Sequence, residues 1–332
     1  TYMFENPVYH RIVMPIEIEK SYRRYSLYSY CEGVVVNLID EIISPVSRAR
    51  DKKKMARNFA FQGHPVLFIV GNADSYRQVR SLGSVAYRMG DQQKQLDYFS
   101  IDFNEELSAL FGGVLQQQTE FVAHAIRKIL SLYKTERTIV LVGNSIGGLL
   151  ARKKSKKNQN DCFSVRLCAG SVFLQPSTRF DPKTVRLIIT QATPHQAPVI
   201  HSDSSIIDFY SRVNHFWKTE WNRTLEHLVL LSLAGGDGRK FALLKNRSCL
   251  SLNRDHLVRS DLCSLNNLTD SSRSIDVLTS AVPNVWSSTD HRCIVWCRQL
   301  VLATTRALLE IIEKKNPDSK MIMQVGLCKS LV

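Results

Sequence analysis

The chain has 332 residues, of which 44% are hydrophobic, and it carries a formal net charge of +14 at pH 7. This content can bury a sizeable core, and no run approaches the ~18 uninterrupted apolar residues that would identify a membrane-spanning helix. The chain as given is therefore expected to be soluble. Because Thr1 is not an initiator methionine, targeting or membrane segments of a longer protein would lie outside it.

Apolar patterns divide the chain into alternating strands and helices. Before residue 138, we predict strands over Pro65–Val70 and Leu96–Asp102, and helices over Gln78–Met89 and Leu115–Tyr133. After residue 152, we predict strands over Thr184–Gln191, Leu228–Ala234 and Ile275–Val282, and a long helix over Cys293–Glu313. This alternation indicates an α/β fold, with a mostly parallel sheet and helices on both faces.

Between these two groups, the apolar strand Thr138–Val142 leads directly into Gly143-Asn-Ser145-Ile-Gly147. The G-x-S-x-G pattern, followed by the apolar helix start Leu149–Ala151, predicts the nucleophile elbow of a serine hydrolase. Such a turn holds the serine hydroxyl out beside a base, and the two glycines remove side chains that would clash with the turn. A structural glycine-rich turn is the alternative interpretation.

A catalytic serine needs a base and an orienting acid, which in this class of fold follow it in the order acid, then histidine. The base is expected at His291, just past the last predicted strand. Asp237 is the first choice for the acid, because it follows Gly235-Gly236 at the end of a predicted strand. Asp255 and Asp261 are alternatives on the same connection.

Two backbone N–H groups are expected to form the oxyanion hole. One belongs to Ile146, next to the nucleophile, and the other to Asn72, which follows Gly71 in the loop after the first predicted strand. Such chemistry needs neither a metal nor an organic cofactor. The eight cysteines include no C-x-x-C pair, so no zinc site is expected.

The excess of Lys and Arg favours an anionic membrane face as a partner over nucleic acid. The basic stretches Arg48–Lys54 and Arg152–Lys157 lack the aromatic interleaving of a nucleic-acid site and are predicted to be solvated loops. Three N-x-S/T sequons, which begin at Asn222, Asn246 and Asn267, favour the lumen of the secretory pathway.

Five blocks of sequence, at residues 1–7, 71–86, 102–110, 189–195 and 288–297, occur in the order of a known family and cover roughly two thirds of the chain. They include Gly71-Asn-Ala-Asp-Ser and Ile189-Thr-Gln-Ala-Thr-Pro-His195, and together they resemble the GPI inositol-deacylases. The resemblance implies an α/β-hydrolase fold in the lumenal domain of an endoplasmic reticulum membrane protein. Such enzymes remove the acyl (palmitoyl) chain from the inositol of GPI anchors.

Carried over residue by residue, the resemblance implies that Ser145 is the nucleophile and His291 the base, with Asp237 placed as the acid. His195, in the Thr-Pro-His motif, is expected to line or shape the site through a structural hydrogen bond. GPI-anchored proteins, their acyl-inositol lipid and the endoplasmic reticulum membrane are the implied partners, and no nucleic acid is expected.

The chain also departs from the family's pattern. Asn144 and Ile146 replace the His and Met of the family's elbow, and Val70 replaces a proline. Asp74 stands where the family has glycine, beside the expected oxyanion donors. A carboxylate aimed inward at that position would oppose the developing negative charge of the reaction.

The expected organisation is a single α/β-hydrolase domain over residues 1–332. Residues 34–62 and 153–177 resemble nothing in the family and are interpreted as insertions or gene-model irregularities, and the membrane portion is expected outside the chain. Two functional alternatives stay open. One is another lipid esterase or acyltransferase with the same triad, and the other is a catalytically silent lumenal protein that binds GPI-anchored proteins.

Overall fold

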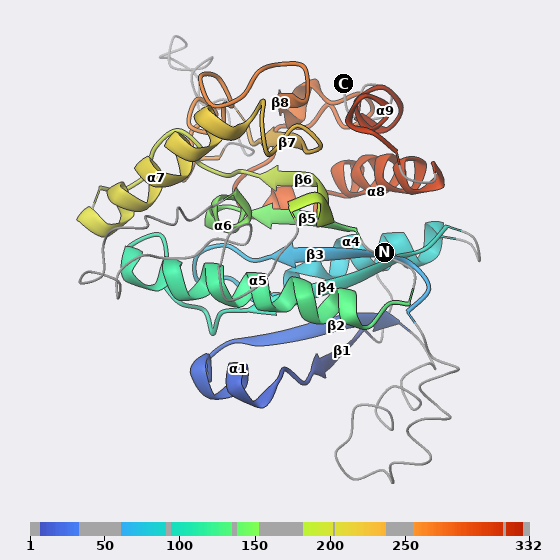
Figure 1. The fold of residues 1–332 in the computed structure, drawn as a ribbon. Coiled ribbons are helices and arrows are strands. Elements are labelled where there is room, and N and C mark those ends of the chain that lie inside the picture. Colours follow the sequence, from blue (N-terminus) through green and yellow to red (C-terminus); the bar gives the residue numbers. More distant parts are fainter. Residues whose placement is uncertain are drawn as a thin grey trace, which may run out of the picture.

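The computed structural model describes residues 7–32, 61–90, 94–134, 138–152, 182–201, 203–236, 255–314 and 317–327. Within these residues, eight strands form one sheet, in the order β1-β2-β4-β3-β5-β6-β7-β8 (Figure 1). The strands are β1 (Pro7–Ile12), β2 (Ser26–Glu32), β3 (His64–Ile69), β4 (Leu96–Asp102), β5 (Ile139–Asn144), β6 (Val185–Gln191), β7 (Val229–Ala234) and β8 (Ser274–Leu278). β2 pairs antiparallel with β1 and β4, whereas the strands from β4 to β8 pair parallel.

Helices cover both faces of this sheet (Figure 1). On one face α4 packs against α8, and on the other α5 packs against α6, which also contacts α7. The helices are α1 (Ile16–Ser21), α4 (Arg80–Met89), α5 (Leu115–Ser131), α6 (Ile146–Arg152), α7 (Ser204–Glu220), α8 (Arg298–Glu313) and α9 (Ser319–Met321). The predicted mostly parallel sheet with helices on both faces is therefore confirmed.

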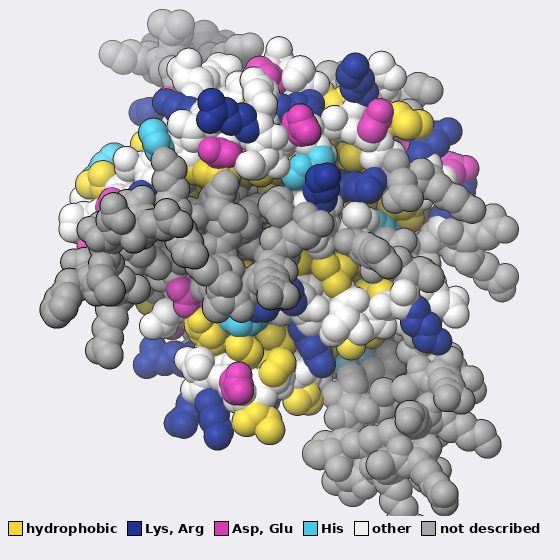
Figure 2. All heavy atoms as spheres, in the orientation of Figure 1, with side chains coloured by type: hydrophobic (Ala, Val, Ile, Leu, Met, Phe, Trp, Pro, Cys, Tyr) yellow, Lys and Arg dark blue, Asp and Glu magenta, His cyan; other side chains and the backbone are white. Residues whose placement is uncertain are grey.

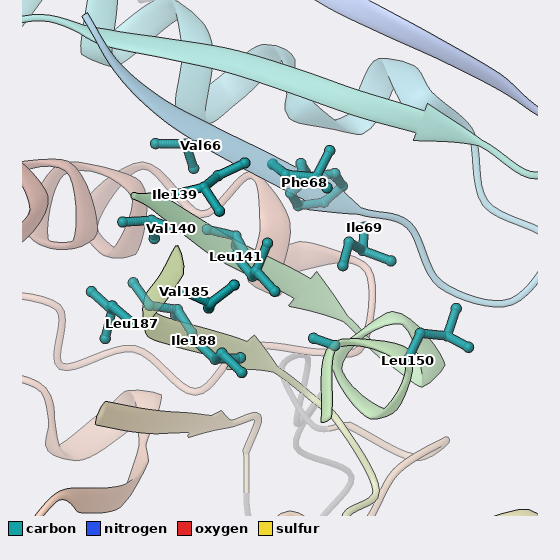
Figure 3. Close-up of a cluster of buried hydrophobic side chains, with 14 of the residues drawn as sticks. Val66, Phe68, Ile69, Ile139, Val140, Leu141, Leu150, Val185, Leu187 and Ile188 are labelled. Atoms are coloured by element: carbon teal, nitrogen blue, oxygen red, sulfur yellow. The ribbon is translucent and has the colours of Figure 1, made fainter. Parts of the chain in front are cut away.

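The central strands are apolar because both of their faces are covered. Figure 3 shows Phe68 and Ile69 of β3, Leu141 of β5 and Ile188 of β6 in one cluster, and all of these side chains are fully buried. A strand buried on both faces appears in the sequence as a continuous apolar run, which explains why these strands could be predicted. Among the described residues, no helix is both long and apolar enough to cross a membrane.

Some predicted boundaries differ from the observed ones. The strand predicted over Ile275–Val282 ends at Leu278, because its pairing partner β7 ends at Ala234, which lies opposite Leu278. The long helix predicted over Cys293–Glu313 is divided into a 3-10 turn, Cys293–Val295, and α8, because Cys297 takes an extended ψ of 115°. The two proposed insertions lie almost entirely outside the described residues.

Helix α7 was not predicted, although its sequence carries a signal. Its buried side chains are Ile206, Phe209, Tyr210, Val213, Phe216 and Trp217, which recur every three or four residues. Asp203 caps the helix, since its carboxylate accepts a hydrogen bond from the N–H of Ser205 at 2.9 Å. The antiparallel strands β1 and β2 and the short helix α1 were also missed.

The backbone of α6 approaches the end of β3 closely at Gly147. A Cβ atom added at Gly147 would lie 2.3 Å from the carbonyl oxygen of Ile69 and 2.5 Å from that of Val70. Neither backbone atom can move without shifting β3. We expect Gly147→Ala to lower the free energy of unfolding by about 3 kcal/mol and the Tm by about 5 °C or more, as measured by calorimetry.

Gly113→Ala is the matched control for that substitution. A Cβ atom at Gly113 would lie 2.9 Å from the ring of Phe111, an exposed side chain that can rotate away. Its cost should stay below about 1 kcal/mol. Equal losses for the two variants would contradict the close approach of α6 to β3.

Candidate functional site

Ser145 lies at the turn between β5 and α6. It has a φ of 53°, which a residue with a Cβ rarely adopts. Its N–H donates to the carbonyl of Gln191 at 2.8 Å, so the turn is fixed to the end of β6. The residues before and after it are buried, and the serine itself is only 6% exposed. This is the geometry of a nucleophile elbow, in which backbone strain holds one hydroxyl at the edge of the sheet.

Strain of the same kind recurs along this edge. Ala73 follows β3 with a φ of 53°, and Ala192 follows β6 with a φ of 48°. Strained backbone that tertiary contacts maintain is typical of functional sites. Since β3, β5 and β6 are parallel neighbours, the three strained residues all follow strands that end at the same edge of the sheet.

His291 and Asp255 form a close pair. The Nδ1 atom of His291 lies 3.0 Å from Oδ2 of Asp255, whose side chain is fully buried. The other carboxylate oxygen accepts from the backbone N–H groups of Leu257 and Val258 at 3.0 and 2.8 Å. The carboxylate is thereby held in one orientation, and with Nδ1–H donating to it, Nε2 of His291 carries the lone pair that a general base needs.

Asp255 packs against Gly235, which directly follows β7. A Cβ atom at Gly235 would lie 2.7 Å from Cβ of Asp255 and 2.9 Å from the carbonyl oxygen of Thr289. Asp255 thus lies beside the end of β7, the strand after which the acid was expected. It comes from further along the chain between β7 and β8 than Asp237 does.

The three acid candidates have different positions. Asp255 contacts His291, while Asp261 forms an ion pair with Arg259 at 2.8 Å and is partly exposed. Asp237 lies outside the described residues. Of the two alternatives named beside Asp237, the structure therefore brings Asp255 to the histidine.

The expected oxyanion donors lie in the turns that follow β3 and β5. Among the described residues, no hydrogen-bond acceptor is found for the backbone N–H of Asn72 or of Ile146. The side chain of Asn72 has a structural role, because its Oδ1 accepts from the N–H of Ala109 at 2.8 Å. The neighbouring Ala73 N–H donates to the carbonyl of Glu106 at 3.1 Å. These two hydrogen bonds thus hold the loop after β3, which would supply the N–H of Asn72 to the oxyanion hole.

Contacts around Gly71 bring Ser145 and Asp74 together. A Cβ atom at Gly71 would lie 2.9 Å from Cβ of Ser145 and 2.6 Å from Oδ2 of Asp74. Burial raises the pKa of Asp74, while the hydrogen bond from Gln78 at 2.7 Å and the nearby charge of His291 act in the opposite direction. Asp74 and His291 are therefore close enough to interact electrostatically. Within the described residues, no hydrogen bond joins Ser145 to His291, and such bonds often form only when substrate is present.

Asp74→Gly should raise kcat/KM for an ester by roughly three- to tenfold, because it removes a negative charge beside the nucleophile. Since burial raises the pKa of Asp74, its carboxyl becomes neutral at a higher pH than an exposed one would. The difference in kcat/KM between wild type and variant should therefore become smaller as pH falls. Steady-state kinetics across pH measures both effects. A lower rate in the variant would instead mean that the carboxylate stabilises the protonated imidazole of His291.

His195 and Arg152 form a second buried cluster. Nη1 of Arg152 lies 2.6 Å from Nδ1 of His195, and Nε2 of His195 lies 2.9 Å from the hydroxyl of Thr190. Burial first, and then the charge of Arg152, hold the pKa of His195 well below its usual value. A neutral His195 accepts from Arg152 at Nδ1 and donates to Thr190 at Nε2. His195 therefore forms structural hydrogen bonds within this cluster, and its expected place in the lining of the site stays a prediction.

The placement of Arg152 in a solvated basic loop was wrong. The side chain is fully buried at the end of α6, where its guanidinium lies 4.8 Å from the ring centroid of Trp217. The indole N–H of Trp217 donates to the carbonyl of Arg152, and Nη2 of Arg152 donates to Asn214. Arginine stacks readily on an aromatic face, which offsets part of the cost of its burial. The remaining residues of that stretch lie outside the described part of the chain.

Comparisons with known proteins show the family of this chain. Residues 60–311 match the family described as the PGAP1-like alpha/beta domain. The chain is 39% identical to the GPI inositol-deacylase of Rattus norvegicus over 98% of its own length and 30% of that protein. It is 37% identical to that of Xenopus laevis over 97% of its length and 30% of that protein, and 31% identical to that of Aspergillus oryzae over 88% and 25%.

The chain thus spans about 30% of the length of the animal relatives that it matches. The family match covers the elbow, the Asp255–His291 pair and the Arg152–His195 cluster. The chain belongs to the family of PGAP1-like alpha/beta domains.

Proposed function

We propose that this chain is the hydrolase domain of a GPI inositol-deacylase, with Ser145, His291 and Asp255 as its triad. The observation that carries the proposal is the buried Asp255–His291 pair at the sheet edge that also holds the Ser145 elbow. Similarity to GPI inositol-deacylases over almost the whole chain supports the choice of substrate.

In the proposed reaction, Nε2 of His291 accepts the proton of Ser145 as Oγ attacks the ester carbonyl of the acyl-inositol. The imidazolium then returns this proton to the inositol oxygen, the inositol leaves, and an acyl-serine remains. Water, deprotonated by His291, releases the fatty acid and restores Ser145. Asp255 stabilises the imidazolium, and the N–H groups of Asn72 and Ile146 stabilise the oxyanion.

The proposed setting is the lumen of the endoplasmic reticulum, where the substrate would be the acyl-inositol lipid of GPI-anchored proteins. Among the described residues, no group of His, Cys, Asp and Glu side chains is arranged to hold a metal ion. The triad described above supplies the base, the acid and the nucleophile from the chain's own side chains.

A cellular assay tests the substrate directly. Phosphatidylinositol-specific phospholipases use the inositol 2-hydroxyl as an internal nucleophile, so an acyl group on this hydroxyl makes an anchor resistant. In cells without their own deacylase, expression of this chain with a membrane anchor should make surface GPI proteins releasable by such a phospholipase. The matched Ser145→Ala chain should leave them resistant.

The position of Asp74 beside Ser145 favours one rival, a catalytically silent protein that binds GPI-anchored proteins. This rival predicts that anchors stay resistant although the wild-type chain is folded and reaches the endoplasmic reticulum. A general lipid esterase predicts equal turnover of triglyceride, phospholipid and acyl-inositol lipid by the purified chain. Either result would overturn the deacylase proposal.

A further inference from the structure

Exposed apolar side chains gather on three segments near the candidate site. Six of them form what we call the apolar rim: Val13, Ile16, Leu107, Leu110, Phe111 and Ile207. They lie before and in α1, in the loop between β4 and α5, and in the first turns of α7. Ile16 is 71% exposed and Phe111 60%, values unusual for large apolar residues of a soluble domain.

Hydrogen bonds and an ion pair join the three segments. Glu106 accepts a hydrogen bond from the hydroxyl of Tyr25 at 2.8 Å and pairs with Arg24 at 3.6 Å, which ties the loop to the chain just after α1. At the other end of the loop, the N–H of Gly112 donates to Asp203 at 2.9 Å, at the start of α7. The three segments that carry the apolar rim are therefore linked, from the chain after α1 through the loop to α7.

The loop in the middle of the rim also contacts the loop after β3, whose Asn72 is a candidate oxyanion donor. The carbonyl of Glu106 accepts from Ala73, and the N–H of Ala109 donates to Asn72. Leu107 and Leu110, which alternate with these two residues, remain exposed. One short segment thus braces the candidate site through its backbone and presents apolar side chains to the outside.

Positive charge gathers at the α1 end of the rim, whereas residues 102–111 of the middle loop carry three acidic side chains and no Lys or Arg. Residues 11–24 carry four basic and two acidic side chains, and one of the acids, Glu19, pairs with Arg11 at 3.7 Å. Lys20, Arg23 and Arg24 are exposed. Figure 2 shows hydrophobic side chains over the region of α1, with Lys and Arg side chains around them and an acidic side chain among them. Apolar residues bordered by basic ones match the interface of an anionic bilayer, where acyl chains lie beneath negative headgroups.

We infer that the apolar rim is a membrane-docking surface that seats this domain on an anionic lipid bilayer with the candidate site at the membrane boundary. A second copy of the chain fits less well, because a symmetric contact through the α1 end of the rim would bring the like charges of Lys20 and Arg23 together. This inference rests on the proposed function only for its purpose: an acyl ester that lies in a bilayer must reach Ser145.

Vesicle flotation of the purified 332-residue chain tests the inference. The chain should bind vesicles of phosphatidylcholine with phosphatidylserine more tightly than vesicles of phosphatidylcholine alone. The double variant Ile16→Ser and Leu107→Ser should weaken binding to both by about tenfold or more. Lys20→Glu with Arg23→Glu should mainly weaken binding to the anionic vesicles, as should added salt.

Two exposed residues away from the rim provide controls. Met321→Ser, on α9, and Arg306→Glu, on α8, match the apolar and the charged substitutions and should leave binding unchanged. Equal losses in rim and control variants, or vesicle binding that survives the rim substitutions, would overturn the inference. So would a wild-type chain that dimerises through the rim and ignores vesicles.

Fluorophosphonate labelling and hydrolysis of a soluble short-chain ester separate this inference from the proposed function. Lys20→Glu with Arg23→Glu should retain both, which also shows that the variant is folded. A labelled, active chain that ignores vesicles would refute docking and leave the hydrolase intact. A chain that binds vesicles through the rim and has an unreactive Ser145 would refute the hydrolase and leave docking intact.

Discussion

Ser145→Ala should abolish both fluorophosphonate labelling and ester hydrolysis, with a loss in kcat on the order of 10⁶-fold. The substitution removes one oxygen at a strained turn, so the attacking atom disappears while the elbow keeps its φ of 53°. Labelling followed by gel fluorescence, and turnover of a soluble ester, measure the two effects on the same sample.

Ser29→Ala is the matched control, because Ser29 is another buried serine, in β2, with no part in the proposed site. It should keep full labelling. Turnover that persists in Ser145→Ala would remove this residue from the mechanism, and loss of the folded state, seen by circular dichroism, would make Ser145→Cys the variant to measure instead. The cysteine variant should fold and should hydrolyse the ester far more slowly than wild type.

Asp255→Asn should reduce turnover by about 10⁴-fold with little change in substrate binding. If the amide oxygen accepts from Leu257 and Val258, the NH2 group faces Nδ1 of His291. In the opposite orientation, His291 meets an amide oxygen, which is a weaker acceptor than a carboxylate. Neither orientation favours the tautomer with a basic Nε2 as the carboxylate does. Steady-state kcat and KM on a soluble ester separate the two effects.

Asp237→Asn and Asp261→Asn are the comparators for that result. Asp261 contacts Arg259 at the surface, so its variant should act like wild type. Because Asp255 accepts the hydrogen bond from Nδ1 of His291, the Asp237 variant should also retain activity. A crippling effect of Asp237→Asn with a mild effect of Asp255→Asn would restore the acid that the sequence favours.

The parts of the fold that sequence could predict are those in which local pattern and burial agree. β4 was predicted at both ends, Leu96 and Asp102, and the elbow strand leads into Ser145 as expected. β1 and β2 were missed because they lie at one end of the sheet, and their tyrosines and serines form no apolar run. The central, doubly covered strands carry the strongest signal.

The site divides in the same way. The candidate nucleophile, fixed by four neighbouring residues, and the candidate base, which lies in a block that resembles the family, are local features. The candidate acid is not local, because Asp255 contacts His291 across 36 positions of sequence, and Asp237 and Asp261 lie on the same connection. The contact of Asp255 with Gly235 and the burial of Arg152 against Trp217 are tertiary facts that no periodicity encodes.

The burial of Arg152 affects where the length of the chain can vary. Helix α6 has only seven residues, and its last one is locked to His195, Asn214 and Trp217. These contacts hold the end of α6, while the N–H of Ser145 donates to the carbonyl of Gln191, so tertiary contacts fix both ends of the elbow helix. Variation of the chain directly after Arg152 should therefore leave Ser145 in position.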